Sequence, residues 1–68
     1  MNRYVSRLER SDVMNAIRML GCDPAEVRTV TMETDVVSVE VYVFDSKGDK
    51  VMVDNDVETR FIEFRIVG

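Results

Sequence analysis

Hydrophobic residues recur at two different spacings along this chain, and the first spacing is helical. Between residues 11 and 21 apolar side chains return every three or four positions, which places them on one face of a helix. Ser11 is expected to cap this helix, and Gly21 is expected to end it in a left-handed conformation. A helix this short is unstable alone, so its apolar stripe must lie against another apolar surface. The stripe consists of Val13, Ala16, Ile17 and Leu20.

The tetrapeptide Asp23-Pro24-Ala25-Glu26 carries a second helix-start signal. Asp23 can cap a first turn, Pro24 suits the first helical position, and Glu26 stands three residues after the cap. Since the apolar spacing changes to two immediately afterwards, we expect only a single helical turn here.

From residue 27 onward the spacing is two, the pattern of half-buried β-strands. This pattern predicts four strands, at residues 27–33, 36–44, 50–53 and 59–67. Turn-forming residues separate them, with Thr34-Asp35 after the first strand, a loop at 45–49 and a turn at 54–56. In the loop, Gly48 is expected to take a positive φ angle.

The predicted fold class is α+β, with one short N-terminal helix packed on a three- to four-stranded antiparallel meander sheet. Residues 1–68 are expected to form a single domain, because no repeat or linker divides them. Residues 1–8 fit either an extended N-terminal arm or an early helical turn, and we favour the arm. The sheet face under the helix is expected to carry Val37, Val39, Val41, Val43, Ile62, Phe64 and Ile66.

The opposite sheet face is mixed in character. Its predicted members are Ser38, Glu40, Tyr42, Phe44, Met52, Phe61, Glu63 and Arg65. Strand twist, the N-terminal arm or a loop can cover the apolar ones, and scattered surface apolar residues are normal. Alternatively they form a protein-contact surface, since one short helix cannot cover both sides of a sheet. The interface candidates are Tyr42, Phe44, Met52, Phe61 and Met19, the last pointing away from the helical stripe. An uncovered edge strand, either the first or the fourth, offers a second route to association.

The small size of the chain argues for association. A domain of 68 residues has a core whose burial only about offsets the entropy of ordering. With one cysteine and no histidine, neither an intrachain disulfide nor a Cys/His zinc site can supply extra stability. A homo-oligomer is therefore expected, and Cys22 is interpreted as a buried thiol packed on the end of the helix.

Catalytic and metal chemistry are not expected. Absence of histidine removes the commonest general base, and no serine stands in a recognisable nucleophile motif, so we predict no enzyme activity and no cofactor. The acids at 45, 49, 54, 56 and 58 suggest calcium, but Thr59 and Arg65 stand where an EF-hand needs glycine and a final acid. Turn formation is the better interpretation of these acids.

The charge pattern bears on partners. Residues 1–28 carry five arginines against four acids, whereas residues 29–68 carry four bases against nine acids, giving −4 overall. Nucleic acid is not an expected partner, because its affinity depends on cationic side chains. The arginines at 3, 7, 10 and 18 are interpreted as a solvated face. No apolar stretch has the length of a membrane span or signal peptide, so a cytoplasmic protein is expected.

The order of motifs over residues 8–53 resembles that of small orphan proteins of actinobacterial phages. It runs from Ser11-Asp12-Val13 through Gly21-Cys22-Asp23-Pro24 to Val41-Tyr42-Val43 and the Asp45-Ser46-Lys47-Gly48 turn. The resemblance implies a phage-encoded accessory or virion protein and assigns no functional residue.

Three hypotheses about function follow. The first is a self-associating, non-catalytic protein-binding or assembly module that works through the Tyr42, Phe44 and Phe61 face or through a sheet edge. The second is an acidic inhibitor or regulator that binds a host protein or mimics nucleic acid through residues 33–58. The third is a structural component of a virion.

Overall fold

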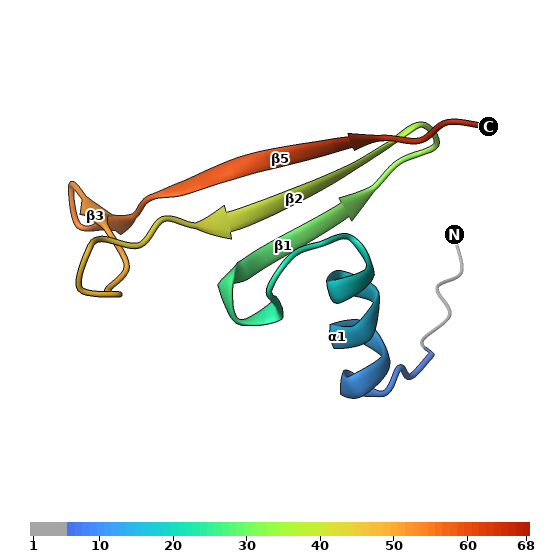
Figure 1. The fold of residues 1–68 in the computed structure, drawn as a ribbon, viewed down its shortest axis with the longest axis horizontal. Helices are drawn as coiled ribbons and strands as arrows, with labels where there is room; N and C mark the ends of the chain where they lie inside the picture. Colours follow the sequence, from blue (N-terminus) through green and yellow to red (C-terminus); the bar gives the residue numbers. More distant parts are fainter. Residues whose placement is uncertain (1–5) are drawn as a thin grey trace.

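A computed structural model describes residues 6–68 of the chain and confirms the α+β class (Figure 1). A helix, α1 (Arg10–Met19), and a 3-10 turn, η1 (Pro24–Glu26), precede five strands. Three of the strands form an antiparallel sheet in the order β1-β2-β5, and the other two form a separate small hairpin. Their bounds are β1 (Val27–Met32), β2 (Val36–Tyr42), β3 (Met52–Val53), β4 (Asp56–Val57) and β5 (Thr59–Arg65).

The start of α1 differs from the prediction. Glu9, and not Ser11, is the N-cap residue, and its side chain makes no capping hydrogen bond. The Glu9 carbonyl accepts from the backbone N–H of Asp12 at 3.1 Å and of Val13 at 3.2 Å, so the first turn closes before Ser11 can act as a cap. Ser11 therefore lies inside the helix.

The end of α1 and the following turn agree with the prediction. Gly21 has a φ of 81°, a conformation that favours glycine, and the Cys22 N–H bonds the Ile17 carbonyl at 3.3 Å. In η1 the Asp23 side chain accepts a 3.0 Å hydrogen bond from the Ala25 N–H. The helix end at Gly21 and the η1 turn together reverse the direction of the chain, so that α1 lies beside β1 (Figure 1).

The predicted third strand is not a member of the main sheet. Residues of that segment form β3, which pairs with β4 in its own hairpin, so β2 pairs directly with β5. The cause is the turn between β3 and β4. Asp54 and Asn55 have φ angles of 50° and 67°, which a two-residue turn joining adjacent antiparallel strands requires. An isolated antiparallel β-bridge between Phe44 and Lys50 precedes the β3–β4 hairpin.

The N-terminal prediction is tested only in part. Residues 1–5 of the predicted arm lie outside the described residues. Residues 6–8 form neither helix nor strand and are exposed.

The core is small. Within residues 6–68, Val37 and Val39 are the only buried side chains, and Val39 is 0% exposed. The Cα radius of gyration is 14.5 Å, whereas a compact chain of this length has about 11 Å. The fold thus leaves much apolar surface open.

Candidate association surface

One face of the sheet is apolar. Partners directly opposite in antiparallel strands project to the same face. Val39 of β2 lies between Val30 of β1 and Ile62 of β5, and the neighbouring row across the sheet is Met32, Val37 and Phe64. The predicted grouping of the β2 valines with Ile62 and Phe64 is thereby confirmed.

Helix α1 covers only the β1 side of this face. An apolar groove remains between α1 and β1, and no residue of α1 is buried. The groove is lined by Leu8, Asp12, Val13, Ala16, Ile17, Leu20, Val30 and Met32. Leu8 and Met32 were not predicted as surface candidates, although Met32 stands two residues after Val30 and so could have been assigned to the apolar face from the spacing alone.

The β5 side of the same face is more open. Ile62 is 37% exposed and Ile66, just after the strand, is 50% exposed, while Phe64 is half-buried. Ile62 and Phe64 continue the apolar face to the rim of the sheet. Ile66 follows at the same spacing of two, just past the end of β5.

Beyond that rim, β5 has an unpaired edge. Within the described chain its ladder partner is β2, and it forms the outer strand of the sheet (Figure 1). The Glu58 carbonyl accepts from the Val43 N–H at 3.1 Å, and the Ile66 N–H donates to the Asp35 carbonyl at 2.9 Å. Because backbone groups of a strand alternate in direction and β5 has no bulge, its even-numbered residues bond towards β2. The N–H and C=O groups of Phe61, Glu63 and Arg65 consequently point away from the sheet.

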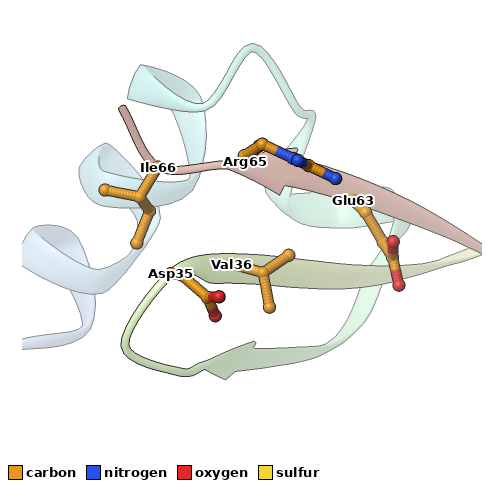
Figure 2. Close-up of a pocket in the computed structure, with 5 residues that line it drawn as sticks. All are labelled: Asp35, Val36, Glu63, Arg65 and Ile66. Carbon is orange, nitrogen blue, oxygen red and sulfur yellow. The ribbon is translucent and has the colours of Figure 1, made fainter. Parts of the chain in front are cut away.

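The opposite face is polar near the end of β5. Figure 2 shows the pocket there, with Glu63 and Arg65 projecting from β5 and Val36 from the adjacent strand β2. Asp35 and Ile66 complete its lining. None of the side-chain hydrogen bonds found in residues 6–68 involves Glu63 or Arg65. Both side chains are exposed and stand at the free edge of the sheet.

The predicted interface candidates do not form one patch. Phe61 is 66% exposed and lies opposite Glu40, next to the Tyr42 and Thr59 pair on the polar face. Phe44 lies past the end of β2, and Met52 is in the separate β3–β4 hairpin. Met19 is almost fully exposed at the last position of α1. Tyr42 is also engaged, since the Lys50 Nζ lies 4.0 Å from the centre of its ring.

The acidic loops form turns. The Asp45 carboxylate accepts from the N–H of Lys47 at 2.9 Å and of Asp49 at 3.0 Å, and Gly48 has the expected positive φ of 85°. In residues 6–68 no three side chains of metal-ligating type gather into a cluster. Cys22, predicted to be buried, is a half-buried free thiol.

Comparison of this chain with protein-family models, with curated proteins and with solved structures finds no match. No helix in the described part of the chain is long and apolar enough to cross a lipid bilayer. Inference about function therefore starts from the surface of the molecule alone.

Proposed function

We propose that this chain is a non-catalytic assembly module of the cytoplasm that acts by associating with further copies of itself. The observation that carries the proposal is the area that one chain leaves exposed. Its accessible surface is 6216 Å², whereas a folded monomer of 7.8 kDa exposes about 4400 Å².

The excess of about 1800 Å² is large on the scale of protein interfaces, which bury roughly 800 Å² per partner at standard size. Residues 1–5 cannot account for it by themselves, because five residues of fully extended chain expose only about 1000 Å². Exposed apolar side chains run from the groove beside α1 to Ile62 in β5 and Ile66 just after it. Covering apolar area by a second copy is the simplest way for such a chain to gain stability.

The residue chemistry supports a binding role over a catalytic one. The chain has no histidine, and the Asp45 carboxylate is committed to its own turn. The pocket in Figure 2 holds two carboxylates, Asp35 and Glu63, and one guanidinium at Arg65, with no hydroxyl or thiol nucleophile among its lining residues.

Size-exclusion chromatography with light scattering tests the proposal. We expect the mass to rise above 7.8 kDa as the concentration approaches several hundred micromolar. The Phe61→Glu variant tests whether the exposed aromatic on the polar face takes part, and Val53→Glu on β3 is a matched control at an exposed apolar residue that is not an interface candidate. A constant monomer mass, with Phe61→Glu leaving stability unchanged, would overturn self-association.

A second candidate function rests on the acidic half of the chain. Asp45, Asp49, Asp54, Asp56 and Glu58 are all exposed and follow one another through the loop and the β3–β4 hairpin. An inhibitor or regulator that uses these acids should retain a stoichiometric host partner, and moderate salt should release it. Replacing Asp54 and Asp56 by Asn should abolish that capture while leaving the oligomeric state unchanged.

A further inference from the structure

We propose that two copies of this chain join along β5, in an antiparallel register centred on Phe64, to give one continuous six-stranded sheet. This inference rests on the proposed function, because it specifies the surface through which self-association occurs. Three features of the sheet edge support it, namely the order of side chains along β5, the direction of its backbone groups and the position of the apolar face.

The end of β5 is self-complementary. The segment Ile62-Glu63-Phe64-Arg65-Ile66 has a phenylalanine at its centre, opposite charges on either side and isoleucines outside them. When two such segments run antiparallel about Phe64, each Glu63 lies opposite an Arg65 and each Ile62 lies opposite an Ile66. Directly opposed pairs of these kinds stabilise neighbouring strands.

Other registers lose this match. Moving the centre of symmetry by one residue shifts every cross-strand partner by two positions, so the apolar faces of both copies stay on the same side. Moving the centre to Glu63 places two glutamates opposite each other, and moving it to Arg65 places two arginines opposite each other. With the centre at Ile62, Glu63 lies opposite Phe61 and the charges find no partners. Among these neighbouring registers, the one about Phe64 alone pairs Glu63 with Arg65.

The backbone at this edge suits the same register. The outward-pointing N–H and C=O groups of β5 belong to its odd-numbered residues, which include Glu63 and Arg65. In the register about Phe64 these two residues lie opposite each other across the new junction. Each such pair can exchange two backbone hydrogen bonds, and the two-fold symmetry supplies the pair twice.

The apolar faces join in this arrangement. A two-fold axis perpendicular to the sheet puts both apolar faces on one side, so Ile62, Phe64 and Ile66 of one copy meet those of the other. Helix α1 does not obstruct the contact, because it lies against β1 at the opposite edge (Figure 1). The other edge strand, β1, is a poorer candidate, since Arg28 is its one charged residue and has no acid within Val27–Met32 to oppose it.

Charge reversal tests the register. In a dimer of the Glu63→Arg variant, both pairs formed between positions 63 and 65 become arginine opposite arginine. In a dimer of the Arg65→Glu variant, both pairs become glutamate opposite glutamate. Each single variant should raise the dimer Kd about tenfold or more, because two attractive cross-strand pairs become repulsive. Glu63→Arg is especially informative, since it moves the net charge from −4 towards neutrality and so reduces general repulsion between copies. Glu26→Arg, on η1, is the matched control and should leave Kd unchanged.

Rescue gives the decisive readout. An equimolar mixture of Glu63→Arg and Arg65→Glu chains should form heterodimers with an affinity within about threefold of wild type, because every arginine then faces a glutamate. The Glu63→Arg/Arg65→Glu double variant should recover self-association in the same way. Sedimentation velocity measures the affinities, native mass spectrometry identifies the heterodimer, and circular dichroism checks that each variant is folded.

The outcomes separate this inference from the proposed function. If wild type dimerises and neither single variant weakens it, or if the mixture shows no rescue, the β5 register is wrong while self-association stands. Wild type that stays monomeric at several hundred micromolar overturns both. A wild-type chain that is monomeric but binds a foreign extended peptide along β5 would assign the edge to another protein and also overturn the dimer.

Discussion

Val39 on β2 and Ile62 on β5 lie directly opposite each other, yet Val39 is 0% exposed and Ile62 is 37% exposed. The difference between these paired residues measures how far the chain covers its own apolar face. Cover is complete at Val39 in the middle strand and incomplete at Ile62, one strand further out. A single chain of this fold therefore has an enclosed centre and an open rim.

The enclosed centre predicts a large effect of truncation at Val39. Val39→Ala should lower the free energy of unfolding by about 2 kcal/mol, because it removes two fully buried methyl groups and leaves a cavity. Val53→Ala, at an exposed position of β3, is the control and should change it by less than about 0.5 kcal/mol. Urea unfolding at one fixed protein concentration measures both. Equal effects of the two substitutions would contradict the assigned core.

A cross-strand hydrogen bond on the other face makes a second prediction. The Thr59 hydroxyl donates to the Glu40 carboxylate at 2.7 Å in a partly buried position. Thr59→Val should lower the free energy of unfolding by about 1 kcal/mol, because the carboxylate loses its donor. Thr31→Val changes an exposed threonine of β1 on the same face and should be nearly neutral. If Thr59→Val proves as stable as the wild type in urea, the hydrogen bond contributes nothing.

The turn that removes the third predicted strand from the sheet can be tested at Asn55. With a φ of 67°, this position suits glycine and is costly for a β-branched side chain. Asn55→Gly should raise Tm slightly, whereas Asn55→Val should cost about 1–2 kcal/mol. Calorimetry measures the change. A neutral Asn55→Val would show that the turn is not left-handed in solution.

Local patterns predicted the elements well because the information is carried by residues close together. The period of two assigned Val37, Val39, Ile62 and Phe64 to one face, and the register confirms that assignment. Gly21, Gly48 and Asp23 were recognised because their turn chemistry depends on one or two neighbours. The same reasoning placed the cap of α1 two residues too late, since Ser11 is the better capping residue but Glu9 has the carbonyl that closes the first turn.

Pairing between distant segments was harder to predict. A meander and a sheet interrupted by a hairpin have the same alternation along residues 50–67, and the left-handed pair Asp54-Asn55 decides between them. The scatter of Tyr42, Phe44, Met52 and Phe61 follows from this, because Met52 leaves the main sheet with β3. How much of a sheet a helix covers depends on where it lies, which the stripe on α1 does not specify.

The proposed self-association makes part of each chain's stability depend on a second chain. Thermal unfolding followed at 2 µM and at 200 µM tests this most directly, because the Tm of an associating protein rises with concentration. We expect Tm to increase by about 5–10 °C over this range if two chains fold and associate together. An identical Tm at both concentrations would contradict the claim.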